Sequence, residues 1–114
     1  MLKKELTVET AEKLGGEGKG KAVLKHFLVG DELPSKAGLA CKIELEPGGS
    51  VSYHKHEGEG EMYYIIKGHG EYQENGKTMP ISEGMTTMVY DGDSHGLVNS
   101  DDCTMEFLAF IIKE

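Results

Sequence analysis

Arginine is absent from this chain of 114 residues, and its formal net charge is −8. Nucleic acids and anionic membrane surfaces bind clusters of basic side chains, which such a chain does not offer. Arginine also grips phosphates with two parallel hydrogen bonds, so a phosphosugar here would depend on lysine or backbone amides. The composition therefore predicts no nucleic-acid partner and no membrane partner, and it favours a neutral or cationic small molecule.

Long apolar runs and paired cysteine motifs are also missing. The first fourteen residues contain no apolar stretch typical of a signal peptide, and no segment is long enough to span a membrane. We therefore expect a cytoplasmic protein. Cys41 and Cys103 are far apart without CxxC spacing, and both lie in apolar, strand-like runs. Two buried, reduced thiols are expected, because free cysteine is commonly buried and a disulfide needs an oxidising compartment.

Helical periodicity is scarce, whereas glycine is abundant at 16 residues. Short strands joined by tight turns are the expected result. A chain of this length forms one domain, with a core small enough that a shared dimer core is plausible. Residues 1–20 are polar and end in LGGEGKGK, so we expect an N-terminal arm or loop there. Residues 21–114 would form the folded domain.

The strand pattern is clearest from Leu39 to Glu46, where apolar and polar residues alternate. Asn75-Gly76 is the strongest signal for a two-residue hairpin. The segment from Cys103 to Lys113 is apolar on both faces in its second half. A terminal strand with two apolar faces would be prone to aggregation unless it were covered, and a homodimer interface would cover it. Eight or more short, evenly spaced strands predict an all-β, double-sheet jelly roll.

Three side chains of metal-ligating types lie close together in GGSVSYHKHEGEGEMYYIIKG. His54 and His56 are two residues apart, so on a strand they point to the same face. A four-residue turn then leads to Glu61, which begins a second strand and returns a carboxylate beside the two imidazoles. His95 follows a turn signal about one strand pair later, and facing hairpins would make it the fourth ligand. Histidine and carboxylate on a rigid β scaffold are typical of a divalent transition metal.

Two spaced motifs resemble the two signatures of the cupin family. The first runs from Gly48 through His54, His56 and Glu61 to Gly68. The second runs through Gly84, Gly92, His95 and Asn99, with Tyr90 where the family usually has proline. That proline shapes a turn, so the departure leaves the ligands untouched. The chain is most similar to small, single-domain cupins without an assigned reaction, which implies a double-stranded β-helix or jelly-roll barrel.

The resemblance implies one divalent metal per chain, Fe, Mn, Ni, Cu or Zn, held by His54, His56, Glu61 and His95. Four protein ligands leave one or two positions open for water, substrate or O₂ at a five- or six-coordinate ion. A small organic molecule would bind in the barrel. A metal-dependent enzyme, dioxygenase-like or isomerase/lyase-like, is the first hypothesis. A non-catalytic binding or sensing module is the alternative, and a storage role ranks last. No catalytic residue is identifiable.

Several other residues have two possible roles at this stage. Tyr63 would either donate a hydrogen bond to a bound ligand or pack as a core aromatic. Asn99 would either orient an imidazole or serve as a structural strand-end residue. His26 is expected to be structural or at an interface, and His69, between two glycines, to be exposed and incidental. Methionines 85, 88 and 105 would line a cavity or fill gaps in the core.

Overall fold

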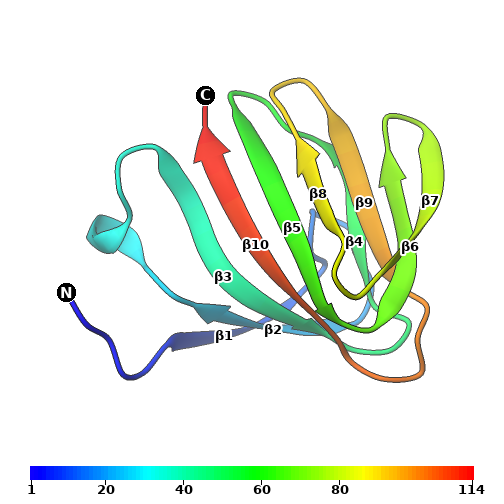
Figure 1. The fold of residues 1–114 in the computed structure, drawn as a ribbon, viewed down its shortest axis with the longest axis horizontal. Helices are drawn as coiled ribbons and strands as arrows, with labels where there is room; N and C mark the ends of the chain where they lie inside the picture. The colour runs from blue at the N-terminus through cyan, green and yellow to red at the C-terminus, as the bar shows by residue number, and fades with distance from the viewer.

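The computed structural model describes all 114 residues, in ten strands and one short 3₁₀ helix (Figure 1). The elements are β1 (Thr7–Glu12), β2 (Lys21–His26), η1 (Gly30–Glu32), β3 (Ala37–Leu45), β4 (Ser50–Lys55), β5 (Glu59–Lys67), β6 (His69–Glu74), β7 (Lys77–Ser82), β8 (Thr86–Val89), β9 (Ser94–Asn99) and β10 (Met105–Lys113). No helix in the structure has the length and hydrophobicity needed to cross a membrane.

Two antiparallel sheets face each other and enclose the core. One sheet has six strands in the order β1-β2-β3-β10-β5-β8, and the other has four in the order β4-β9-β6-β7. Apolar side chains on alternate positions of both sheets point inward, as sandwich packing requires. The all-β, double-sheet prediction is therefore confirmed.

The core is most tightly closed at one end of the barrel. Leu45, Ile65, Leu97, Met105 and Phe107 are each 0% exposed and come from four strands of the two sheets. Leu45 on β3 lies opposite Met105 on β10, so the central strands of the six-stranded sheet are locked together there. Burying side chains of this size contributes about 1.5–3 kcal/mol each before entropy is subtracted.

The hairpin predicted at Asn75-Gly76 is confirmed. It joins β6 to β7, and both residues have positive φ, 48° and 84°. Asparagine and glycine tolerate that region, and two such residues match the twist of the strands they join. The Asn75 side chain also accepts a hydrogen bond from the Ser94 amide at 2.9 Å, which ties the turn to the start of β9.

The first twenty residues differ from the expected arm or loop. Residues 7–12 form β1, which pairs with β2 along six residues and extends the six-stranded sheet at its edge (Figure 1). The sequence TVETAE lacks an apolar face, so its pattern did not indicate a strand. Its side chains are almost all exposed, because the strand is held by backbone pairing at an edge and not by burial.

The C-terminal strand β10 is not an edge strand. It lies between β3 and β5, and both of its backbone edges are therefore paired. The two cysteines also differ from each other. Cys41 is buried as predicted, whereas Cys103 is exposed in the turn before β10, so the prediction of two buried thiols was wrong for Cys103. The strand begins two residues later than the sequence suggested, after a turn held by Asp101.

Candidate metal centre

The structure brings His54, His56, Glu61 and His95 together inside one end of the barrel. His56 Nε2 lies 3.2 Å from His54 Nε2 and 2.9 Å from His95 Nε2. Glu61 Oε1 lies 3.1 Å from His95 Nε2 and 3.3 Å from His56 Nε2. All four donor atoms lie within 4.8 Å of one another, and only His54 is more than marginally exposed.

Strand pairing accounts for this convergence. His54 on β4 lies directly opposite His95 on β9, which places both rings on the inner face of the four-stranded sheet. The pairing shifts register between Val51 and His54, and a bulge of this kind re-aims the side chains that follow it. Glu61 comes from β5 in the facing sheet, so the site bridges the two sheets at the open end of the barrel.

The spacing of the donor atoms fits a transition metal ion. Bonds from imidazole or carboxylate to such ions are about 2.0–2.2 Å long, so neighbouring ligands at right angles lie about 3.0 Å apart. The four separations between these donor atoms, from 2.9 to 3.3 Å, lie around that value. Three imidazole nitrogens and a carboxylate form a donor set suited to several divalent first-row metals. These four residues could therefore hold one ion.

Electrostatics favour an anionic carboxylate at the centre. Burial alone would raise the pKa of Glu61, but hydrogen bonds from His56 and His95 outweigh burial and lower that pKa. The hydrogen bond to Glu61, opposed by burial and helped by Glu59, raises the pKa of His56. A buried carboxylate that is charged and surrounded by ring nitrogens is a favourable environment for a cation.

Each imidazole is oriented by a different neighbour. His54 Nδ1 donates a hydrogen bond to the backbone oxygen of Ser52 at 2.6 Å, which directs Nε2 toward the centre. His56 Nδ1 lies 3.4 Å from Glu59 Oε1. His95 has no protein partner at Nδ1, and the ring of Tyr63 stacks on it with centroids 5.0 Å apart and an interplanar angle of 18°. Such support fixes which nitrogen faces a metal.

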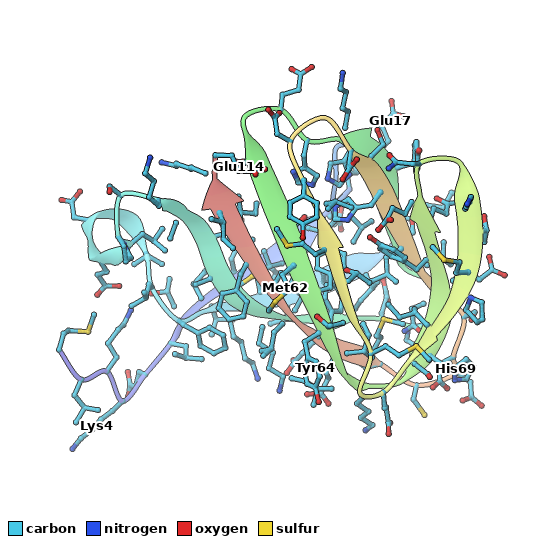
Figure 2. The ribbon with its side chains drawn as sticks, turned by 45° about the horizontal axis from the view of Figure 1, so that its top comes forward. Lys4, Glu17, Met62, Tyr64, His69 and Glu114 are labelled. Carbon is cyan, nitrogen blue, oxygen red and sulfur yellow. The ribbon has the colours of Figure 1, made fainter.

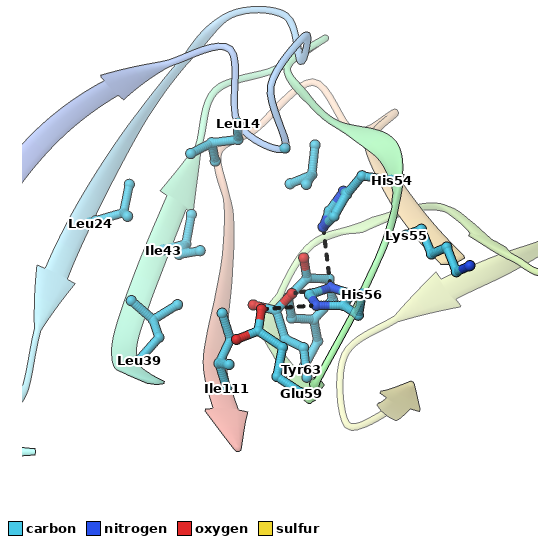
Figure 3. A pocket seen from close by; sticks show the side chains of 13 residues that line it. Leu14, Leu24, Leu39, Ile43, His54, Lys55, His56, Glu59, Tyr63 and Ile111 are labelled. Carbon is cyan, nitrogen blue, oxygen red and sulfur yellow. Dashed lines mark hydrogen bonds and ion pairs between the residues drawn. The ribbon is translucent and has the colours of Figure 1, made fainter. Parts of the chain in front are cut away.

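A cavity of about 260 Å³ lies beside the donor atoms (Figure 3). One wall carries the imidazoles of His54 and His56, and aliphatic side chains face them from across the cavity. The aliphatic residues across the cavity are Leu14, Leu24, Leu39, Ile43 and Ile111, and Val51 on β4 also lines it. A small polar head group could reach the centre while its remainder contacts hydrocarbon, which is a common design of small-molecule sites.

Tyr63 and Glu59 line the cavity, and the spacing of residues in the sequence could not predict their roles there. Tyr63 lines the cavity and is 2% exposed, and burial, followed by the Glu61 carboxylate, raises the pKa of its hydroxyl far above the ordinary value. Glu59 is the only carboxylate in the cavity besides Glu61. The sequence showed Glu59 only as part of an acidic turn, and its place at the start of β5 could have suggested the inward orientation. Lys55 also borders the cavity, but its side chain extends away from the two imidazoles (Figure 3).

Asn99 has a structural role and does not touch an imidazole. Its Nδ2 donates to the carbonyls of Leu45, Glu46 and Cys103, at 2.9 to 3.1 Å, and its Oδ1 accepts from the Asp101 amide. These bonds close the turn that leads into β10. Of the methionines, Met105 fills the core, while Met85 and Met88 line a separate cavity of about 340 Å³ near β7 and β8.

The two remaining histidines lie outside the centre. His26 Nε2 is 2.8 Å from Glu9 Oε1, across the β1–β2 pair, which fits the structural role expected for it. His69 is exposed and lies 3.1 Å from Asp101 Oδ2. Figure 2 shows His69 at the end of the molecule opposite Glu17.

A family model, a relative and a solved structure all resemble this chain over most of its length. Residues 41–111 match the family model described as Cupin domain. A protein of Thermotoga maritima named Oxalate-binding protein is 42% identical over 108 residues, which is 95% of this chain and 88% of that protein. A crystal structure from the same organism, described as a predicted oxalate decarboxylase, superimposes with a TM-score of 0.90 at 41% identity, covering 96% and 95% of the two chains.

A more distant structure shows the same fold. The cupin domain of Cnp3 from Schizosaccharomyces pombe has a TM-score of 0.73 at 9% identity, covering 98% of this chain and 90% of that domain. Similarity at that identity concerns the architecture alone. The family model covers more than half of the chain, from within β3 to within β10. The chain therefore belongs to the cupin family.

Proposed function

We propose that this protein binds one divalent transition metal through His54, His56, Glu61 and His95 and uses it to bind oxalate or a similarly small carboxylate. The observation that carries the proposal is the convergence of four donor atoms, three of them on buried residues, beside a small cavity. The name of the 42% identical relative, Oxalate-binding protein, supports the choice of ligand. When bound, the ion would supply positive charge and open coordination positions for carboxylate oxygens.

The charges of the cavity make this binding depend on the metal. The chain has no arginine, the cavity contains the carboxyl groups of Glu59 and Glu61, and the side chain of Lys55, at the border of the cavity, extends away from the imidazoles. Without an ion, a dianion would meet these two carboxylates and would be repelled. The composition favoured a neutral or cationic ligand for the same reason, and an anion becomes favourable only if the ion reverses the local charge.

The test is calorimetric titration of oxalate into protein purified without a metal-affinity tag. We expect one oxalate per bound metal after loading with Mn²⁺ or another divalent ion, and no binding after the metal is removed with EDTA. The double variant His54→Ala/His56→Ala should lose both metal and oxalate, whereas His69→Ala should keep both. Oxalate binding to metal-free protein, or its absence with every metal tried, would contradict the proposal.

Catalysis is the second candidate function, and Glu59 is the observation that favours it. Release of CO₂ from oxalate requires a proton to replace the lost carboxylate and give formate. The Glu59 carboxyl lines the cavity and contacts His56, so it is positioned near a bound ligand to deliver that proton. Formate production by metal-loaded protein, lost in Glu59→Gln with oxalate affinity retained, would establish a lyase. Tight oxalate binding without product would establish a binding module.

A homodimer is proposed for the outer face of the six-stranded sheet. Tyr64, Ile66 and Ile112 are 40%, 42% and 45% exposed there, and they lie on β5 and β10, which are neighbours in the sheet. Exposed apolar side chains grouped on one sheet face are typical of a protein interface. A second copy would cover the same face in a twofold arrangement. Sedimentation should give twice the chain mass, and Tyr64→Lys should shift it to the monomer.

A further inference from the structure

The loop between β1 and β2 covers the free edge of β4. Strand β4 is the outermost strand of the four-stranded sheet, so one row of its backbone groups has no strand partner. Residues 13–20 take that place. The Ser52 amide donates to the Leu14 carbonyl at 2.9 Å, and the Ser50 amide donates to the Lys19 carbonyl at 2.8 Å. The loop is therefore held along the strand that carries His54.

The side chain of Ser52 adds a second set of bonds to the same loop. Its hydroxyl donates to the Gly15 carbonyl at 2.8 Å and accepts from the Glu17 amide at 3.1 Å. The Ser52 carbonyl, in turn, accepts the hydrogen bond from His54 Nδ1 at 2.6 Å. One residue thus connects the loop to a proposed metal ligand, because the bonds to the loop fix the peptide whose carbonyl orients the imidazole.

Gly15 sets how closely the loop approaches this arrangement. Its φ is +75°, and a Cβ added there would lie 2.8 Å from the Ser52 carbonyl oxygen and 2.9 Å from His54 Nδ1. Those distances are below normal van der Waals contact, so any side chain would displace the loop or the imidazole. The neighbouring Gly16 has φ +103° and nothing within 4 Å of the same added atom. Among the glycines of the loop, close contact with His54 is thus specific to Gly15.

The loop also borders the cavity. Leu14 and Gly15 are among its lining residues, and Leu14 lies on the aliphatic side, across from His54 (Figure 3). A displacement of the loop would therefore change the shape of the space available to a ligand as well as the orientation of the ring.

From these contacts we infer that the β1–β2 loop, anchored by Ser52 and Gly15, is a positioning element for His54 and a wall that limits ligand size. The sequence region concerned was expected to be an arm or loop without a role in the site. The role in orienting His54 follows from the contacts alone, whereas the role in limiting ligand size rests on the proposed binding of oxalate.

The experiment compares Gly15→Ala and Ser52→Ala with two matched controls. Gly16→Ala introduces the same methyl group at a positive φ but in open space. Ser82→Ala removes a hydroxyl from β7, where its partner is Met85 and not the loop. Long-range ¹⁵N–¹H NMR on the metal-free full chain at about pH 8, above the ordinary imidazole pKa of about 6.5, reads which ring nitrogen of His54 carries the proton.

We expect the wild type and both controls to hold the His54 proton on Nδ1, and Gly15→Ala and Ser52→Ala to show a mixture of tautomers. In Mn²⁺-loaded protein, oxalate affinity should fall about tenfold or more in Gly15→Ala, as expected for a misplaced site group. In Ser52→Ala, the preference for oxalate over malonate should decrease. Malonate is longer by one methylene, and a site discriminates against one methylene by about tenfold or more only if the wall of the cavity, here the β1–β2 loop, does not yield.

Two results would overturn the inference. One is a wild-type tautomer in both Gly15→Ala and Ser52→Ala. The other is an equal change in Gly16→Ala, which would show that backbone strain, and not contact with His54, is responsible. If wild-type protein binds no oxalate while the tautomer changes as expected, the proposed ligand is wrong and the positioning role stands.

Discussion

The interior of the barrel has a polar end and an apolar end, and single strands cross both. Along β5 the inward residues are Glu61, Tyr63 and then Ile65, and along β9 His95 is followed by Leu97. All of these side chains are almost completely buried. The polar end buries groups that are costly to desolvate unless they are paired, whereas the apolar end gains free energy from burial.

The two ends of each strand therefore have different roles. The apolar end holds the sheets together, and the polar end uses the resulting rigidity to keep four donor atoms converged. Substitutions at the two ends should consequently have different effects on stability and on metal binding.

The largest effect on stability is expected for Phe107→Ala at the apolar end. Phe107 is 0% exposed and its ring packs against Tyr63 with centroids 5.0 Å apart. Truncation of a buried phenylalanine costs about 3–5 kcal/mol, which could unfold a domain of this size. Denaturant unfolding measures the loss. Met85→Ala, at a residue 47% exposed, should change the unfolding free energy by less than about 0.5 kcal/mol. Equal losses would mean that the core is not where we place it.

His95→Ala should affect metal binding more than stability, the opposite of Phe107→Ala. Metal affinity should fall by more than the roughly 10- to 100-fold seen when only a supporting group of a metal site is removed. The unfolding free energy of metal-free protein should fall by about 1–2 kcal/mol, less than for Phe107→Ala. Elemental analysis after dialysis gives the metal content. His69→Ala is the control and should keep it, and full stoichiometry in His95→Ala would remove this residue from the site.

Asn99→Ala should lower stability without affecting the metal. The amide makes four hydrogen bonds to backbone groups at the apolar end, and none to an imidazole. Leaving buried partners unpaired costs about 1–3 kcal/mol. Thermal unfolding and elemental analysis of the same sample separate the two quantities. A loss of metal comparable to that in His95→Ala would show that the two ends are coupled.

The smallest expected effect is a difference in reactivity between the two cysteine thiols. Burial, followed by the Glu61 and Glu9 charges, raises the pKa of the Cys41 thiol to about 12, whereas Cys103 is exposed. A thiol reagent should modify one group in the native protein and two after unfolding, and Cys103→Ser should abolish the native reaction. Stability should fall as the pH rises above the unfolded thiol pKa of about 8.5, because only the unfolded state then releases its proton. Two rapidly reacting native thiols would contradict the burial of Cys41.

The sequence was sufficient to predict features that depend on alternation and on turns. The four proposed ligands could be selected because His54 and His56 share a strand face and a short turn returns Glu61. The hairpin at Asn75-Gly76 followed from the need for positive φ at both positions. In each case the information is local, or it comes from the family resemblance.

Features that depend on distant contacts could not be predicted. Strand β1 has no apolar face, so only its pairing with β2 identifies it. The approach of Gly15 to His54 joins residues that are far apart in the chain, and a glycine-rich stretch by itself indicates only a flexible turn. Cys103 follows a polar run and was assigned to the strand because of the apolar residues after it, although the bonds of Asp101 and Asn99 place it in a turn.

The position of β10 has a consequence for the order of folding. Glu61 lies on β5, and β5 completes its sheet only when β10 pairs with it, Glu61 itself lying opposite Ile111. During synthesis, His54, His56, Glu61 and His95 are all translated before that partner strand. Pairing between segments so far apart in sequence is also slow. A nascent chain would therefore carry all four proposed ligands before it could hold them in place, and metal capture should follow closure of the six-stranded sheet.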